Sequence, residues 1–165
     1  MKDLSSTDKG LVAWFCLFAF VALIFEPLYY FGCDWHGHSC VGAENNAIVD
    51  ATRKIWLIYA SWDPIFYDIP NWLRVLSCIE VFIFGPLYLV VAIGLWNNSP
   101  WLESVALPFC GALVYSTIVY FAMELIENIP NTNYFAVFFV NIPWTIVPIL
   151  LWLRLRECHN KLKKG

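Results

Sequence analysis

Ionisable and amide side chains lie inside segments of this chain that are otherwise almost wholly apolar. Glu26 and Glu80 occupy two such segments, and Asn141 occupies another. An ionisable group costs several kcal/mol inside a bilayer unless it faces protein or water, so each is a functional-site hypothesis by default. Two carboxyl groups held in different protonation states form a proton donor and a proton acceptor. The chemistry that these residues predict is acid–base catalysis in a water-poor site.

A further apolar segment carries a polar stripe at helical spacing. Its members are Thr117, Tyr120, Glu124 and Glu127. Spacings of three and four residues place them on one face of a helix. Four apolar segments thus bring a polar group to a similar depth, which predicts one shared, polar-lined cavity. The alternative is that each carboxyl group only hydrogen-bonds a neighbouring helix, and for Glu124 and Glu127 simple solvation near the membrane surface is the favoured interpretation.

Aromatic residues form the second chemical clue, because they make up 18% of the chain. Trp144 follows Asn141 by three residues and therefore shares its helix face. An indole face stabilises a cation, so an aromatic wall beside these acids suits a flat polycyclic or amine-bearing ligand. The alternative, favoured for most of the phenylalanines, is that the rings only fill the space between helices.

The elements that hold these residues must be embedded in a bilayer. Of the 165 residues, 60% are hydrophobic and 14% are charged, whereas an average soluble domain is about 45–50% apolar and about 25% charged. A soluble chain of this size hides only about 70% of its surface, too little to bury this apolar content. The net charge of −3 also argues against binding to nucleic acid.

Four stretches are long enough to cross about 30 Å of hydrocarbon. They cover residues 11–31, 72–96, 101–126 and 134–153. Short connections between the last three predict antiparallel neighbours, while a long polar loop separates the first two. We therefore expect an all-α, integral membrane four-helix bundle that forms a single domain over residues 1–165. Prolines inside the spans predict kinks, at Pro27, Pro86, Pro143 and Pro148.

The basic residues predict the orientation in the membrane. They cluster before the first span and after the last, at Lys2, Lys9, Arg154, Arg156, Lys161, Lys163 and Lys164. The positive-inside rule then places both termini in the cytosol and the long loop in the lumen. Lysines three and five residues from the end resemble the dilysine retrieval signal of the endoplasmic reticulum, although plain stop-transfer charge is an alternative. We expect a multi-pass protein of the endoplasmic reticulum membrane.

The long loop contains a short cysteine and histidine segment. Cys33 and Cys40 flank His36 and His38. In an oxidising lumen the favoured interpretation is a disulfide, ahead of two free thiols. A zinc site ranks third, because this spacing matches no established ligand pattern, and we expect neither a metal nor a cofactor.

Short landmarks in order along residues 12–155 resemble the EXPERA family of four-helix membrane proteins, which includes sterol Δ8–Δ7 isomerases and the sigma-2 receptor. They are Phe25-Glu26-Pro27, Tyr59-Ala60-Ser61-Trp62-Asp63, Cys78-Ile79-Glu80, Phe84-Gly85-Pro86-Leu87, Val114-Tyr115, Tyr120-Phe121, Asn141-Ile142-Pro143-Trp144 and Val147-Pro148. The resemblance implies that the acids at 26, 63 and 80 line one ligand pocket, and that Asn141 and Trp144 hold a sterol. The isomerases have a histidine at the position of Ala22, and the receptor has a glutamine at the position of Phe84.

Together these features predict an isomerase or cyclase that acts on a sterol or terpenoid through a carbocation. The catalytic candidates are Glu26, Asp63 and Glu80. The substrate-binding candidates are Asn141, Trp144, Tyr120, Thr117, Phe84 and Glu124. The alternative is a non-catalytic receptor or trafficking protein that binds sterols or cationic amphiphiles. The expected partners are the small molecule and membrane lipid, and the sequence allows a homodimer.

Overall fold

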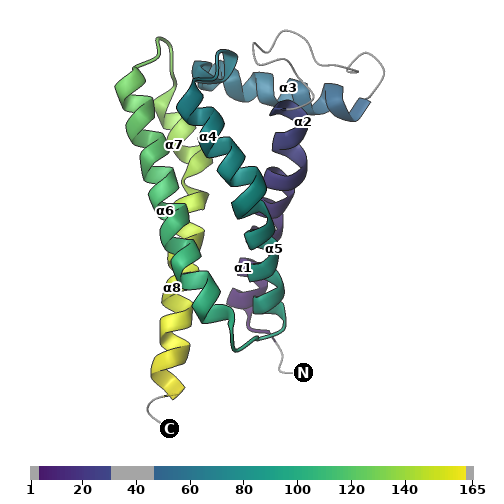
Figure 1. Ribbon diagram of the computed structural model, residues 1–165, viewed down its shortest axis with the longest axis vertical. Coiled ribbons are helices and arrows are strands. Elements are labelled where there is room, and N and C mark those ends of the chain that lie inside the picture. The colour runs from purple at the N-terminus through teal and green to yellow at the C-terminus, as the bar shows by residue number, and fades with distance from the viewer. Residues whose placement is uncertain (1–3, 31–46, 163–165) are drawn as a thin grey trace.

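Four long apolar helices form the body of the protein, seen in a computed structural model that describes residues 4–30 and 47–162 (Figure 1). The helices that can cross a membrane are Ser6–Leu28, Asn71–Trp96, Leu102–Glu127 and Tyr134–Arg156. All regular structure in the described ranges is helical. The predicted all-α bundle of four membrane spans is therefore confirmed. The sequence segment around Cys33 and Cys40, and the last three residues of the tail, lie outside the described residues.

The first two spans share an unusual construction. Helix α1 (Ser6–Phe20) runs through a π-helical turn, η1 (Val21–Phe25), into α2 (Glu26–Tyr30). Helix α4 (Asn71–Ile79) likewise runs through η3 (Glu80–Phe84) into α5 (Gly85–Trp96).

Both π turns end two residues before a proline, and in each a backbone hydrogen bond joins residues five apart. The N–H of Glu26 bonds the carbonyl of Val21, and the N–H of Gly85 bonds that of Glu80. A proline inside a helix lacks the N–H and clashes with the carbonyl four residues earlier, so a wider turn before Pro27 or Pro86 relieves the clash. π turns of this kind are frequent at functional sites; here Glu26 directly follows the first turn and Glu80 begins the second.

The two π turns meet where the first two spans pack together. A Cβ atom built on Gly85 would lie 2.6 Å from Cδ2 of Leu23, so any larger residue would require the Leu23 side chain to move. The main hydrophobic core extends from this contact and includes Phe15, Phe18, Tyr88, Phe109 and Leu151. The crossing fixes the two acid-bearing turns relative to one another.

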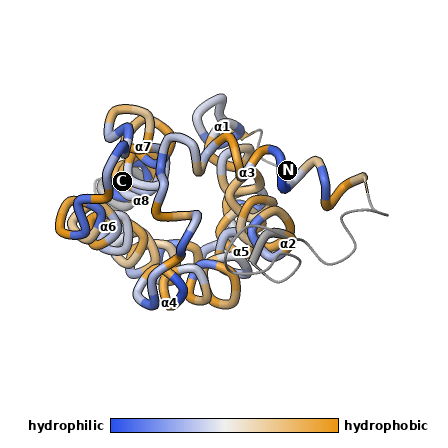
Figure 2. Tube along the Cα trace, turned by 90° about the horizontal axis from the view of Figure 1, so that it is seen from above, coloured by the Kyte–Doolittle hydropathy of each residue, from blue (hydrophilic) through white to orange (hydrophobic). Residues whose placement is uncertain are grey.

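The third and fourth spans differ from each other in continuity. Helix α6 (Leu102–Glu127) is uninterrupted and ends at Asn128, whose φ of 46° is left-handed. The fourth span is divided into α7 (Tyr134–Asn141) and α8 (Pro143–Leu162). Pro143 has no N–H to continue the helix, so the break falls directly after Asn141. Viewed along the bundle, α6, α7 and α8 lie on one side, α1, α2 and α5 on the other, and α4 lies between them (Figure 2).

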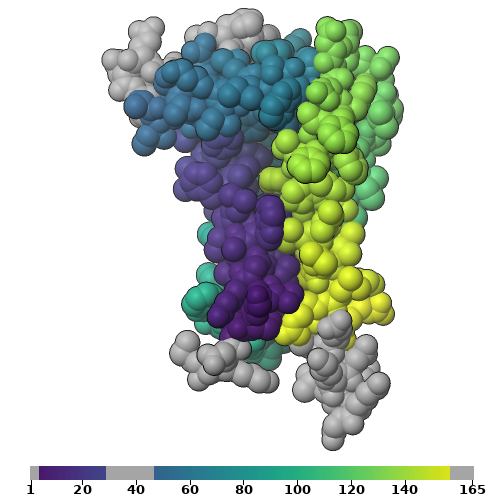
Figure 3. Space-filling model, turned by 180° about the vertical axis from the view of Figure 1, so that it is seen from behind, coloured from purple at the N-terminus to yellow at the C-terminus, as the bar shows by residue number. Residues whose placement is uncertain are grey.

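The connection between the first two spans corrects the prediction of a polar loop. Residues Ala47–Trp62 form helix α3, which is followed by a short 3₁₀ turn, η2 (Pro64–Tyr67). Helix α3 lies across the end of the bundle, above the first span and beside α7 (Figures 1 and 3). One face is buried through Trp56 and Ala60, while its exposed face carries Ile48, Ile55, Ile58 and Trp62. An amphipathic helix of this kind is typical of the membrane interface.

The opposite end of the bundle is closed by an ion pair. Arg154 binds both oxygens of Asp8 at 3.0 Å, and Asp8 is only 5% exposed. Ser5 caps α1 by accepting the N–H of Asp8 at 3.1 Å, which explains why the first span begins earlier than its apolar stretch. The first and last spans begin and end at this same end, as four antiparallel crossings require (Figure 1). Its cytosolic location stays a prediction.

Candidate functional site

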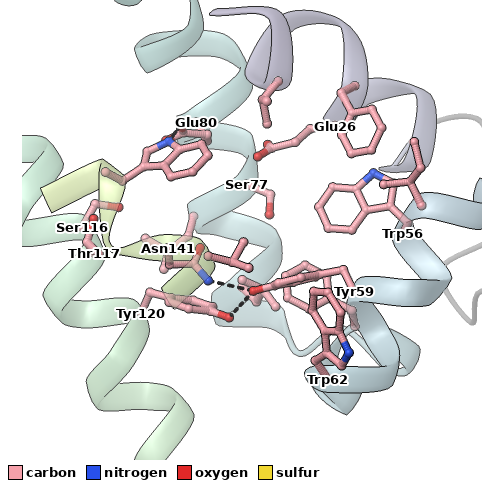
Figure 4. A pocket seen from close by; sticks show the side chains of 18 of the residues that line it. Glu26, Trp56, Tyr59, Trp62, Ser77, Glu80, Ser116, Thr117, Tyr120 and Asn141 are labelled. Carbon is pink, nitrogen blue, oxygen red and sulfur yellow. Dashed lines mark hydrogen bonds between the residues drawn. The ribbon is translucent and has the colours of Figure 1, made fainter. Parts of the chain in front are cut away.

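A cavity of about 410 Å³ lies between α3 and the spans, a volume typical of small-molecule sites. Its polar lining consists of Glu26, Tyr59, Ser77, Glu80, Ser116, Thr117, Tyr120 and Asn141 (Figure 4). Its apolar lining includes Phe25, Trp56, Trp62, Leu113 and Trp144. The lining residues Ile55, Ile58, Trp62 and Val140 also face the outside. The cavity is therefore bordered by apolar side chains where α3 approaches α7.

Glu80 is held in place by two hydrogen bonds to one of its oxygens. The hydroxyl of Tyr88 donates to Oε1 at 2.5 Å, and the indole N–H of Trp144 donates to the same atom at 3.3 Å. Trp144 in turn stacks on Phe18 with ring centroids 4.5 Å apart. Donors on both sides stabilise the ionised carboxylate, so Glu80 is arranged as a proton acceptor.

Glu26 has the opposite environment. Its carboxyl group points into the cavity near Ser77 (Figure 4). Its Oε2 atom is buried and has no hydrogen-bond partner among the described residues. A buried carboxylate without a donor carries a large desolvation cost, which favours the neutral acid. Glu26 is therefore arranged as a proton donor or as the counter-ion of a cationic ligand.

A hydrogen-bonded chain lies at the α3 end of the cavity. The amide nitrogen of Asn141 donates to the hydroxyl of Tyr59 at 2.8 Å and to the carbonyl of Val137 at 2.8 Å. The hydroxyls of Tyr59 and Tyr120 are 3.2 Å apart, and Tyr120 donates to Oδ2 of Asp63 (Figure 4 shows the first part of this chain). The break after Asn141 places its side chain at this point.

Behind the two tyrosines lies a pair of buried acids. Asp63 and Glu124 are 0% and 1% exposed, and their carboxyl groups lie within hydrogen-bonding reach of each other. Burial raises the pKa of Asp63, whereas hydrogen bonds from Tyr120 and Glu124 limit the rise. Burial and the nearby Asp63 also raise the pKa of Tyr59. Among the residues that the structure describes, no cation pairs with these two adjoining carboxyl groups, so they need a shared proton.

The structure brings six of the nine candidate residues to one cavity. They are Glu26, Glu80, Thr117, Tyr120, Asn141 and Trp144. Asp63 and Glu124 lie behind this wall, and Phe84 packs in the core with its ring 5.6 Å from that of Phe109. The interpretation of Glu124 as a solvated residue is wrong, because its side chain is 1% exposed and lies beside Asp63. Glu127 is exposed, as expected, and accepts a hydrogen bond from Trp72.

Sequence reasoning missed three residues that shape the site. Tyr59 was noted only as part of a landmark, although it joins Asn141 to Asp63. Tyr88 supplies the shortest bond to Glu80 from two turns further along its span, a spacing that could have revealed it. Trp56 stacks on Phe25, with ring centroids 5.5 Å apart, at the side of the cavity. The helical periodicity of α3 is the signal that could have identified both Trp56 and Tyr59.

These features define a multi-pass membrane protein with an acid-lined internal cavity. The family model EXPERA, the expanded EBP superfamily, matches residues 48–155. The chain therefore belongs to the EXPERA family, as the landmarks predicted. A search of curated proteins found no match.

Proposed function

We propose that this protein is a membrane isomerase or cyclase that moves a proton within a sterol or terpenoid. The observation that carries the proposal is the contrast between the two cavity acids. Glu80 accepts two hydrogen bonds on one oxygen, whereas a buried oxygen of Glu26 has no partner among the described residues. Family membership supports the same range of functions, since EXPERA proteins include sterol isomerases and sigma-2-like binding proteins.

The proposed reaction begins with the neutral carboxyl group of Glu26. Its proton is added to one carbon of an alkene, or to an epoxide oxygen, and a carbocation forms. The carboxylate of Glu80 then removes a proton from a different carbon, and those C–H electrons become the new double bond. Glu26 is left ionised and Glu80 protonated, so one proton must return before the next turnover. Catalysis of this general acid–base type contributes about 10²–10⁴-fold in rate.

Aromatic side chains would protect the cation. Trp144 lies beside Glu80 in the cavity wall, with one face stacked on Phe18. The indole is thus fixed in position, and its π system can stabilise a positive charge in the adjacent cavity. The apolar border formed by Ile58 and Val140 would admit such a ligand directly from the bilayer. A largely apolar lining also keeps water away from the cation.

The test is a turnover assay with purified protein and a panel of sterols and triterpenes, followed by mass spectrometry. We expect one member to be isomerised by the wild type and to be left unchanged by Glu80→Gln. Glu103→Gln, at the far end of α6, is the matched control and should retain full activity. The proposal is contradicted if no panel member is turned over and Glu80→Gln is indistinguishable from wild type.

The second candidate is a non-catalytic protein that binds sterols or cationic amphiphiles. The unpartnered oxygen of Glu26 favours it, because an ionised Glu26 next to Trp56 and Phe25 would suit a ligand ammonium group. The presence of Ala22 where the isomerases have a histidine points the same way. Lipid extracted after purification distinguishes the two functions, because a receptor releases its ligand unchanged whereas an enzyme converts it on incubation.

A further inference from the structure

The hydrogen atoms of Asn141 and of its nearest hydroxyl partners are directed at acceptors within the protein. Asn141 has two amide hydrogens, and they are directed at the hydroxyl of Tyr59 and the carbonyl of Val137. The opposite amide orientation would place Oδ1 against the Val137 carbonyl oxygen, and two acceptors cannot bond each other. The amide is therefore fixed, and Oδ1 is the group that Asn141 can offer to a ligand.

The neighbouring hydroxyls follow the same direction. Tyr120 donates to Asp63, so the hydrogen between the two phenols comes from Tyr59, which lies 3.2 Å from Tyr120 and 3.4 Å from Oδ2 of Asp63. Thr117 donates its hydroxyl to the Leu113 carbonyl at 3.0 Å. Each of these groups lines the cavity, and each has only lone pairs left for a ligand.

The buried acids explain why the direction is fixed. A hydrogen-bonded chain that ends on a carboxylate must donate toward it, because an ionised carboxylate only accepts. Asp63 can stay ionised because the Glu124 carboxyl group beside it can carry their shared proton. Asp63 and Glu124 thus act on the ligand through Tyr120 and Tyr59, without touching it. They are positioning residues.

We infer that the cavity selects ligands whose polar group at the Asn141 end is a hydrogen-bond donor, either a hydroxyl or a protonated amine. A ketone in the same place would oppose its oxygen to the acceptors of Asn141, Tyr59 and Thr117. The inference rests on the proposed function only in naming a sterol-like ligand. It concerns binding, and it holds for an enzyme or a receptor.

The test compares the binding of a 3-hydroxysterol, the matching 3-ketone, the 3-methyl ether and the 3-amine to purified protein in detergent. We expect the alcohol and the amine to bind about ten- to a hundredfold more tightly than the ketone and the ether, the usual effect of leaving buried polar groups unpaired. The affinities of the alcohol and the amine, compared with each other, then show whether the natural donor is neutral or cationic. A ketone that binds as tightly as the alcohol, or an alcohol that does not bind, overturns the inference.

Two variants test the mechanism of selection. In Asp63→Asn, the amide can donate a hydrogen bond to Tyr120, so the hydrogen bonds between Asp63 and Asn141 can reverse their direction. The affinities for the alcohol and the ketone should then differ by no more than about threefold. Tyr59→Phe frees one amide hydrogen of Asn141 and should also narrow the preference, which provides an answer if Asp63→Asn does not fold. Glu127→Gln, the exposed acid one turn beyond Glu124, should keep the wild-type preference. An unchanged preference in a folded Asp63→Asn or Tyr59→Phe protein contradicts the role assigned to the chain.

These outcomes are separate from the proposed isomerase activity. Selective binding of the alcohol without any turnover would support the inference and reject the enzyme. Turnover without selective binding of the alcohol would support the enzyme and reject the inference.

Discussion

The hydroxyl of Tyr88 lies 2.5 Å from Oε1 of Glu80, two helical turns away on the same span. The wide η3 turn and Pro86 separate the two residues along the chain. Tyr88 is fully buried against Phe15, Phe18 and Phe109, so its hydroxyl can hardly move. The aromatic core thereby fixes the orientation of the acid that we assign as the proton acceptor.

Replacement of Tyr88 by phenylalanine should uncouple ligand binding from turnover. The ring would remain packed, but Glu80 would lose its closest donor, a change of about 1–3 kcal/mol for a buried charged group. We expect turnover to fall by about tenfold or more while ligand affinity changes by less than about threefold. Tyr115→Phe, at an exposed position on α6, is the control. Equal turnover in both variants would remove Tyr88 from the catalytic arrangement.

The close crossing of the first two spans predicts that the stability of the protein is sensitive to a larger side chain at position 85. Alanine there would place its Cβ 2.6 Å from Cδ2 and 2.9 Å from Cγ of Leu23, and such overpacking costs typically about 1–3 kcal/mol. Thermal unfolding in detergent should therefore show a clear loss of stability. Gly111→Ala meets no atom within 4 Å and should be neutral or slightly stabilising. Leu23→Ala combined with Gly85→Ala should recover part of the loss, and failure to do so would contradict this explanation.

The ion pair at the other end of the bundle predicts strong coupling between the first and last spans. Asp8→Asn leaves Arg154 without the bidentate partner that it contacts at 3.0 Å. Because the Arg154 side chain is 28% exposed, the loss should be smaller than the roughly 3–5 kcal/mol typical of a fully buried pair. In a double-mutant cycle with Arg154→Met, the double variant should be more stable than the sum of the two single losses implies. Additive losses would show that the two side chains act independently.

The stability of the protein should depend on pH through Asp63. Burial raises the pKa of this group above its ordinary value of 3.8, so the folded state binds a proton more tightly than the unfolded state does. Its contribution to stability is complete below pH 3.8 and is lost as the pH rises through the higher pKa of the folded state. Asp63→Asn should flatten this part of the stability profile. Parallel profiles for wild type and variant would show that Asp63 is not the group responsible.

The spans and their acids could be predicted because each signal is local. The length of an apolar stretch identifies a membrane helix. An acid within one, such as Glu80, is easily recognised because an ionisable group in the bilayer costs several kcal/mol of free energy. Pro27 and Pro86 signal disturbed helices, but the wide turns that result depend on how the two spans cross at Gly85. Local patterns could not show that Tyr59 would reach Asn141, because α3 must first fold over the end of the bundle.

Glu124 illustrates the same limit. Its distance from the end of the third span is that of a residue near the membrane surface, and by itself this favours solvation. In the structure it is buried beside Asp63, which comes from a distant part of the chain. Phe84 illustrates the converse. Its position in a family landmark, where the receptor has a glutamine, favoured the site, whereas packing against Phe109 directs it into the core.

If Glu26 and Glu80 exchange protons with a bound sterol or terpenoid, isotope transfer from water to the product reveals it. Protein equilibrated in D₂O would be given the unlabelled substrate that emerges from the turnover panel, and the product would be analysed by mass spectrometry. We expect the wild type to give a product that carries deuterium at the newly protonated position, and neither Glu26→Gln nor Glu80→Gln to give any product or label. A labelled product formed equally well by both variants, or a ligand recovered without label from the wild type, would contradict it.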